Sequence, residues 1–199
     1  MNFLAHLFLS DGSDEGLLGG LMGDFVKGPL DDRYAPGIRR GIVLHRHIDT
    51  YTDAHEVVHR SKARVSAARR RYAGIMVDMF YDHFLARDWA TFSDEPLAAF
   101  ARRAYDLLAR NHAMLPERLQ RMAPYMIRGD WLGSYAEVES IGDSLDGMSR
   151  RMKRENRLEG SVEELVDNYN DFAADFHDFM PALISFARAE SLSLPHDGN

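Results

Sequence analysis

The sequence predicts an all-α protein that forms a single helical bundle. Apolar residues recur at helical spacing along most of the chain, whereas no stretch alternates apolar and polar residues for long enough to form a sheet. No internal repeat or low-complexity linker divides the chain. Its 199 residues are 45% hydrophobic, which is enough for one substantial core, so we expect one domain over residues 1–199.

Glycines, prolines and capping residues mark where the expected helices begin and end. We expect helices over about residues 16–25, 37–53, 54–72, 75–89, 96–110, 116–127 and 135–152, the last as one helix or as two broken near Gly142. Four glycines weaken the first of these helices, but small residues also allow a close approach.

A further long amphipathic helix is expected from Ser161 to about residue 190. Ser161 and Glu164 form a capping-box pattern, and the aromatic residues that follow recur at helical spacing as a core stripe. We expect Pro181 to kink or restart this helix and residues 191–199 to fray. Residues 91–190 are therefore interpreted as scaffold, while the chemically suggestive motifs fall within residues 1–90.

Composition excludes several classes of site and partner. The chain has no cysteine, which rules out disulfides, thiolate zinc sites and cysteine nucleophiles and fits a reducing compartment. The N-terminus lacks the basic start of a signal peptide, and no apolar run approaches the roughly 20 residues that span a bilayer. The net charge of -7 argues against nucleic-acid binding. We therefore expect a cytoplasmic protein without a membrane or nucleic-acid partner.

The segment Gly41–Asp53 carries the most suggestive pattern in the chain. His45, Asp49 and Asp53 follow one another at intervals of four residues, so a helix brings them onto one face. Such a face is suited to a metal ion, and Arg46 beside it can meet an anionic substrate. For Asp53 we prefer the alternative role of a cap on the following basic helix.

Other histidines and acids stand in otherwise apolar segments, namely His6, Asp24, Asp78, Asp82 and His83. Buried carboxylates are unfavourable unless paired or metal-bound, so either an arginine such as Arg87 pairs with Asp82 or a cation lies nearby. Imidazole and carboxylate ligands without sulfur suit Mn²⁺, Mg²⁺, Fe²⁺ or Zn²⁺. Such an ion lowers the pKa of water and neutralises phosphoryl charge, which makes phosphoester cleavage the natural reaction class. No nucleophile elbow, phosphate-binding loop or dinucleotide-binding turn suggests another chemistry.

Several motifs, in the same order along the chain, resemble the bacterial acyl carrier protein phosphodiesterase family. They are Asn2–Leu7, Gly23–Gly28, His45–Arg46 with Ile48–Asp49, Thr52–Asp53, and Asp78 with Tyr81–Leu85. The resemblance implies an all-helical fold related to the HD phosphohydrolases. It also implies a metal-dependent enzyme, best served by Mn²⁺ with Mg²⁺, Fe²⁺ or Co²⁺ as other ions, that removes 4'-phosphopantetheine from holo acyl carrier protein.

The resemblance also implies roles for individual residues. It gives Asp24, His45, Asp49 and Asp78 as metal ligands, and His6, Arg46, Asp82 and His83 as catalytic or supporting residues. In the implied reaction water attacks phosphorus, Arg46 and the ion stabilise the developing charge, and the serine oxygen of the carrier leaves. The usual HD signature is an adjacent His-Asp pair, but the first half of the chain has only the reversed Asp82-His83, and His177-Asp178 lies on the late aromatic helix. The ligand set of ordinary HD enzymes is therefore not carried over.

Two basic clusters stand out in this acidic chain. The first comprises Arg60, Lys62, Arg64, Arg69, Arg70 and Arg71, and the second comprises Arg150, Arg151, Lys153, Arg154 and Arg157. The resemblance makes the first cluster a docking surface for the acidic acyl carrier protein, whereas the alternative is a solvated helix face. Two other functions stay open: a metal phosphohydrolase of nucleotides or other small phosphoesters, and a non-catalytic helical module that binds an acidic carrier domain. The sequence predicts no oligomeric state.

Overall fold

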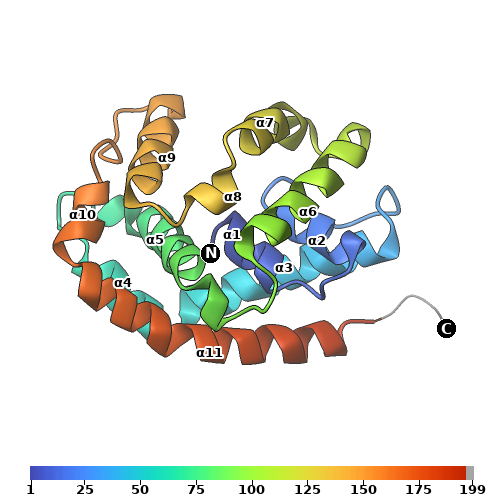
Figure 1. The fold of residues 1–199 in the computed structure, drawn as a ribbon, viewed down its shortest axis with the longest axis horizontal. Coiled ribbons are helices and arrows are strands. Elements are labelled where there is room, and N and C mark those ends of the chain that lie inside the picture. The colour runs from blue at the N-terminus through green and yellow to red at the C-terminus, as the bar shows by residue number, and fades with distance from the viewer. Residues whose placement is uncertain (196–199) are drawn as a thin grey trace.

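The computed structural model describes residues 1–195 and confirms the predicted fold class. Within these residues there are eleven α-helices, three short 3-10 helices and no strand (Figure 1). The α-helices are α1 Phe3–Phe8, α2 Asp14–Met22, α3 Pro36–Ala54, α4 Glu56–Arg64, α5 Ala73–Arg87, α6 Leu97–Arg110, α7 Glu117–Arg128, α8 Trp131–Ser134, α9 Val138–Arg151, α10 Val162–Asp167 and α11 Tyr169–Ser193. The 3-10 helices are η1 Arg70–Tyr72, η2 Trp89–Thr91 and η3 His112–Met114. None of the described helices is both long and apolar enough to cross a membrane.

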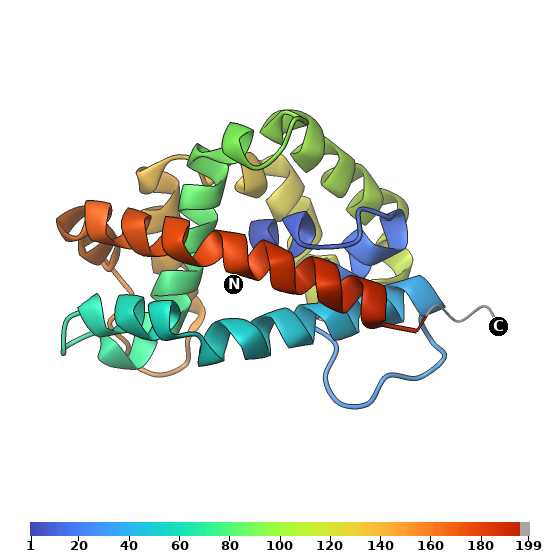
Figure 2. The same ribbon diagram turned by 90° about the horizontal axis from the view of Figure 1, so that it is seen from below.

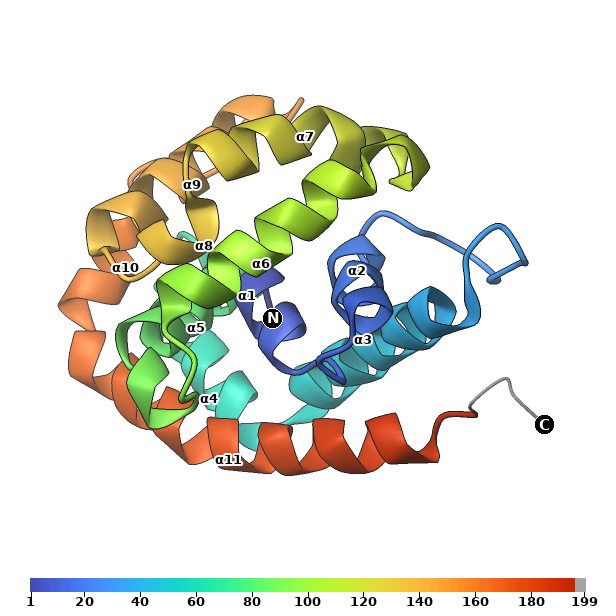
Figure 3. The ribbon, with the colours of Figure 1, turned by 45° about the vertical axis from the view of Figure 1, so that its right-hand side comes forward.

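The short helix α1 lies in the middle of the molecule, in contact with α2 and α5 (Figures 1 and 3). Helix α11 packs along one side against α3, α4 and α5 (Figure 2), while α6 and α7 lie on the opposite side. Helix α5 is apolar almost all round, as expected for a helix that other helices enclose. Its Phe80 and Phe84 are fully buried with Phe172, Phe176 and Phe179 of α11, so the predicted aromatic stripe belongs to the core.

Helices α2 and α3 approach each other through glycines, small residues that allow such a close approach. A Cβ atom on Gly19 would lie 2.4 Å from the Ile38 carbonyl oxygen and 2.7 Å from the Gly41 Cα. A Cβ atom on Gly41 would lie 2.7 Å from the Gly16 carbonyl oxygen. The contact is therefore backbone against backbone, and neither helix has room for a side chain there.

A buried carboxylate joins α11 to α4. The side chain of Asp175 is 1% exposed, and its oxygens accept hydrogen bonds from Arg60 Nε at 2.6 Å, Ser61 Oγ at 2.7 Å and Arg64 Nε at 2.8 Å. Burial alone would raise the pKa of Asp175, but these donors outweigh it and lower the pKa below its usual value. Two arginines of the first basic cluster therefore serve the packing of α11 on α4.

The basic helix is shorter than predicted and has a different cap. Helix α4 ends at Arg64, where the chain leaves the helical conformation because the Ser66 backbone N–H donates to the Glu164 carboxylate at 3.0 Å. Its first turn is capped by His55, whose Nδ1 accepts from Val57 N at 3.3 Å. The predicted cap Asp53 lies inside α3 and instead pairs with Lys62 at 2.7 Å.

The long C-terminal helix also differs from its prediction. Ser161 has a helical backbone and makes no capping bond, while Glu164 is engaged by Ser66, so the capping-box pattern does not operate. The chain forms two helices, α10 and α11, on either side of Asn168, and α11 continues through Pro181 to Ser193. Residues 191–193 of the predicted frayed tail belong to α11, and its residues 196–199 lie outside the described part. Helix α9 is not broken at Gly142.

We expect Gly41→Ala to destabilise the protein by about 2–3 kcal/mol, because the added methyl group meets backbone on α2 that cannot move aside. Gly74→Ala is the matched control, since the nearest atom to its added Cβ is Lys62 Cε at 3.9 Å. This second change should stabilise α5 by about 0.5 kcal/mol. Urea unfolding measures both values, and equal effects of the two changes would contradict the proposed close contact.

We expect Asp175→Asn to lower stability by about 2 kcal/mol at pH 7, because two arginines lose a buried anionic partner. The folded-state pKa of Asp175 is lower than the unfolded-state value of about 3.9, so the stabilisation is complete above that pH and is lost as the pH falls below it. The difference between wild type and variant should therefore shrink in acid. Asp178→Asn, at a 62% exposed acid paired only with Arg60, should change stability little.

Candidate metal centre

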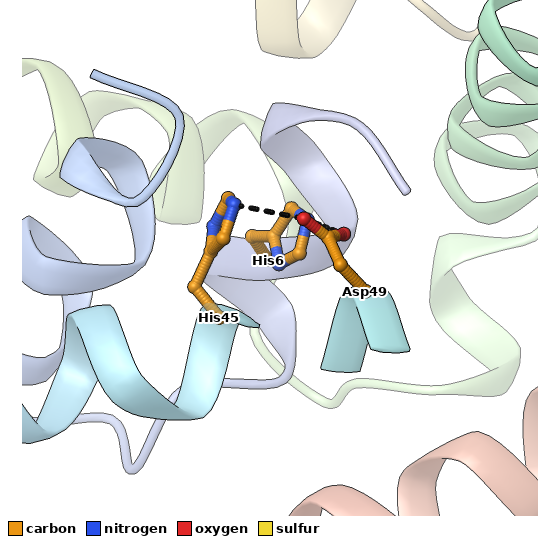
Figure 4. Close-up of side chains that lie close together, drawn as sticks. All are labelled: His6, His45 and Asp49. Atoms are coloured by element: carbon orange, nitrogen blue, oxygen red, sulfur yellow. Dashed lines mark ion pairs between the residues drawn. The ribbon is translucent and has the colours of Figure 1, made fainter. Parts of the chain in front are cut away.

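His6, His45 and Asp49 converge between α1 and α3 (Figure 4). Each offers one ligand atom, and these atoms all lie within 4.8 Å of one another. Asp49 Oδ2 is 3.2 Å from His45 Nε2, and Asp49 Oδ1 is 3.0 Å from His6 Nε2. Both imidazoles are buried, whereas the Asp49 side chain is 39% exposed, so the group opens to solvent on its carboxylate side.

The orientation of His45 follows from the glycines of α2. His45 Nδ1 lies 2.8 Å from the Gly20 carbonyl oxygen, which can only accept, so Nδ1 carries a proton and Nε2 points toward the acids. Gly23 leaves the ring its space, because a Cβ atom there would lie 2.2 Å from His45 Cγ. The His6 ring stacks on the other side at a centroid distance of 3.6 Å. A hydrogen bond of this kind to a backbone carbonyl is typical of histidines that bind metals.

His6 is held in place by Asp82 of α5. The Asp82 carboxylate accepts hydrogen bonds from the backbone N–H groups of Leu4 at 2.8 Å and Ala5 at 3.2 Å, and it is fully buried. It thereby satisfies donors in the first turn of α1, where Asn2 provides no side-chain cap. Burial raises the pKa of Asp82 to about 7. The alternative in which Arg87 pairs with Asp82 is not the one observed: Asp82 binds α1, and Arg87 pairs with Asp88.

The remaining predicted ligands border the same group. Asp24, in the turn after α2, has its Oδ1 3.7 Å from His45 Nε2. Asp78 of α5 binds the Met1 amino group at 3.0 Å, and this amino group lies 3.6 Å from Asp49. Asp24, Asp49, Asp53 and Asp78 all line one cavity of about 240 Å³. Of the four ligands implied by the resemblance, His45 and Asp49 thus lie with His6 in the candidate group, while Asp24 and Asp78 border the adjoining cavity.

The acids set the charge of the two imidazoles. Burial, with His45 as a neighbour, lowers the pKa of His6 to about 4. Burial also disfavours the charged form of His45, but Asp24 and Asp49 outweigh it and raise its pKa to about 9. Although burial opposes ionisation of Asp49, the two histidines lower its pKa far below the usual value. The field at His45 Nε2 therefore favours positive charge.

These residues fit a divalent metal ion. Both ring nitrogens of His6 and Nε2 of His45 are buried and make no hydrogen bond within the described residues. Buried polar atoms normally have a partner, so one nitrogen of each ring is open to a metal ion, which at His45 would take the place of the proton on Nε2. Two imidazole nitrogens with a carboxylate oxygen form a donor set that Mn²⁺, Fe²⁺ and Zn²⁺ accept.

Two other predicted site residues lie apart from this group. His83 is fixed by the Tyr135 carbonyl oxygen at 2.9 Å and the Tyr169 hydroxyl at 2.8 Å. Arg46 Nη2 donates to the Val26 carbonyl oxygen at 2.8 Å and so ties the turn that carries Asp24 to α3. Their contacts are those of residues that support neighbouring segments.

The His-Asp pair of α11 also lies apart from the metal centre. His177 contacts Asp88 at 3.0 Å, and Asp178 pairs with Arg60 at 2.7 Å. Both residues therefore belong to the ionic contacts of the scaffold.

The first basic cluster is largely engaged within the molecule. Arg60 and Arg64 pair with Asp175, Lys62 pairs with Asp53, and Arg69 contacts Glu163 and Glu164. Arg70 donates to the carbonyl oxygens of Val65 and Ala63, and Arg71 is exposed. Its prediction as a docking surface stays a prediction.

A second, larger cavity adjoins the metal centre and was not predicted. It has a volume of about 570 Å³ and shares Asn2, Asp24 and Met148 with the smaller one. Its other walls come from α7, α8 and α9, including Arg118, Trp131 and Arg151. The sequence singled out Arg151 only as part of the second basic cluster, and no sequence signal pointed to Arg118 or Trp131, which stand in segments that resemble ordinary scaffold.

The fold and the histidine–carboxylate group place the chain among all-helical proteins with an internal group that could hold a metal ion. Within that class, the chain belongs to the acyl carrier protein phosphodiesterase family, whose model matches residues 1–183. It is 38% identical to the acyl carrier protein phosphodiesterase of Photorhabdus laumondii, over 94% of this chain and 95% of that protein. The proteins of the same name from Pectobacterium atrosepticum and Yersinia enterocolitica are 38% and 36% identical, each over 96% of this chain and all of the relative. No solved structure matches the chain.

We expect His45→Gln to weaken Mn²⁺ binding about 100-fold, because it removes a ring nitrogen of the metal centre. His47→Gln is the matched control: His47 lies on the same helix but is 42% exposed and contacts Glu190 at 2.7 Å. Calorimetric titration with Mn²⁺ measures both affinities. Equal affinities for wild type and His45→Gln would exclude His45 as a ligand.

Proposed function

We propose that this protein is a metal-dependent phosphodiesterase that removes 4'-phosphopantetheine from holo acyl carrier protein and leaves the apo form. The observation that carries the proposal is the buried His6–His45–Asp49 group, in a chain that belongs to the acyl carrier protein phosphodiesterase family along most of its length. Relatives that bear this name cover the whole chain apart from a few residues.

The ion in this proposal is Mn²⁺, with Mg²⁺, Fe²⁺ and Co²⁺ as other ions the site accepts. His6, His45 and Asp49 hold it, and Asp24 and Asp78 are the nearest further carboxylates, since both line the cavity that Asp49 borders. Mixed nitrogen and oxygen donors without sulfur support this choice of ions. When bound, a divalent ion lowers the pKa of water and neutralises charge on a phosphoryl oxygen.

Asp24 is the residue we assign to proton transfer. Burial opposes its ionisation, but the neighbouring His45 lowers its pKa, so it is a carboxylate at neutral pH. Its side chain is 48% exposed and borders both cavities, where it can accept the proton of an attacking water at a carboxylate oxygen. Arg46 supports this role by holding the Asp24 turn through the Val26 carbonyl.

The two products, apo carrier and 4'-phosphopantetheine, determine which bonds form and which bonds break. The water oxygen bonds to phosphorus, and the bond between phosphorus and the serine oxygen of the carrier breaks. The serine oxygen takes up a proton, and 4'-phosphopantetheine leaves with the phosphate. One water molecule is consumed, and no oxidant or second substrate is needed.

The larger cavity supports a substrate with a long arm. Pantetheine is a flexible chain with apolar and amide portions, and a cavity of about 570 Å³ next to the metal centre is large enough to enclose a ligand of drug size. Its walls combine apolar side chains such as Phe3, Phe25 and Trp131 with the cations Lys27 and Arg118. We assign the arm to this cavity, with its phosphate at the end bordered by Asp24.

We expect the purified protein to convert holo acyl carrier protein to the apo form in the presence of Mn²⁺ but not in excess chelator. Mass spectrometry of the carrier measures the loss of 4'-phosphopantetheine. Asp49→Asn should abolish the conversion, whereas Asp53→Asn, at an exposed acid bound to Lys62, should keep most of it.

An unchanged carrier mass with every divalent ion tested would refute the proposal. Turnover of small phosphodiesters in the same samples would then favour the phosphohydrolase of small substrates. A lack of both activities would favour the non-catalytic carrier-binding module.

A further inference from the structure

The second basic cluster occupies the last turn of α9 and the loop that follows it. Residues 150–157 contain five basic residues against a single acid, Glu155. All five are exposed: Arg150, Arg151, Lys153, Arg154 and Arg157. This loop lies at the outer edge of the molecule, between α9 and α10 (Figure 1). We call residues 150–157 the basic loop.

The cations of the basic loop have no internal counter-charge. Within residues 1–195, none of their side chains forms an ion pair or a hydrogen bond. The first cluster is different, because Arg60, Lys62, Arg64 and Arg69 all contact carboxylates of the same chain. Paired cations contribute little attraction for an external anion, so the five unpaired cations of the basic loop attract such a partner more than the first cluster does.

The basic loop also borders the proposed path of the substrate. Arg151 lines the larger cavity together with Asp24, and Met148, one turn earlier on α9, lines both that cavity and the metal-centre cavity. A partner bound at the basic loop would therefore sit next to the opening through which an arm reaches the metal centre.

We propose that the basic loop is the docking surface for the acidic carrier protein, an inference that rests on the proposed function. The chain carries a net charge of -7, so an acidic partner is repelled by most of its surface and needs a local positive patch to approach. The basic loop is such a patch, its cations need not break internal ion pairs to bind, and it adjoins the cavity assigned to the arm. The first cluster is also rich in basic residues, but it does not meet the other two conditions.

Binding of fluorescently labelled apo acyl carrier protein, followed by anisotropy at low salt, tests this surface without needing catalysis. We expect Lys153→Glu/Arg154→Glu to raise the Kd about tenfold and to flatten its dependence on salt, because steering charges are reversed. Arg102→Glu/Arg188→Glu is the matched control, since it changes net charge equally at exposed positions on α6 and α11. This control should keep the Kd within about twofold of wild type.

A third variant, Arg70→Glu/Arg71→Glu, tests the first basic cluster directly. The proposal is overturned if Lys153→Glu/Arg154→Glu binds like wild type, if the control loses as much affinity, or if only Arg70→Glu/Arg71→Glu binds weakly. Thermal melting of all variants identifies any loss of folding. Conversion of holo carrier by the wild type is measured separately by mass, so a failed phosphodiesterase activity is distinguished from a wrong docking surface.

Discussion

The close contact between α2 and α3 is the constraint on which the metal centre depends. Glycines on both helices let the two backbones meet, and this brings the Gly20 carbonyl within hydrogen-bonding distance of His45 Nδ1. Gly23 then leaves room for the imidazole ring. The result is a histidine whose tautomer and direction are fixed before any ligand arrives, which is the preorganisation that a metal site requires. Wider spacing of the two helices would leave the same residues in the sequence without the site.

Helix α1, which brings His6 to the metal centre opposite α3, is too short to be stable by itself. Helix α1 has six residues and no side-chain cap of its own, yet it carries His6 into the interior. Asp82 stabilises its first turn from α5, and Asp78 binds the amino group of Met1. Two carboxylates of α5 thus position the start of the chain. Acids that looked alike in the sequence therefore have different roles: some support α1, and others border the metal centre.

The two basic clusters also differ because of their tertiary surroundings. The two basic clusters have similar composition, but α4 packs on the acidic face of α11, where Asp175 is buried among its donors. Its arginines are therefore part of the fold. The cations of the loop after α9 form no ion pair within the described residues, so they remain available. Attraction for an acidic partner depends on this difference and not on the number of basic residues.

The sequence by itself determined the all-α class, most helix positions and the shared face of His45 and Asp49, because all of these follow from the local period of one helix. Tertiary structure decided which acid has which partner: Asp82 binds α1 and not Arg87, Glu164 binds Ser66 and not Ser161, and Asp53 binds Lys62. It also brought His6 to the centre and opened the larger cavity beside it. These contacts join residues far apart in the chain, and their energies depend on burial and distance, which no local pattern of residues encodes.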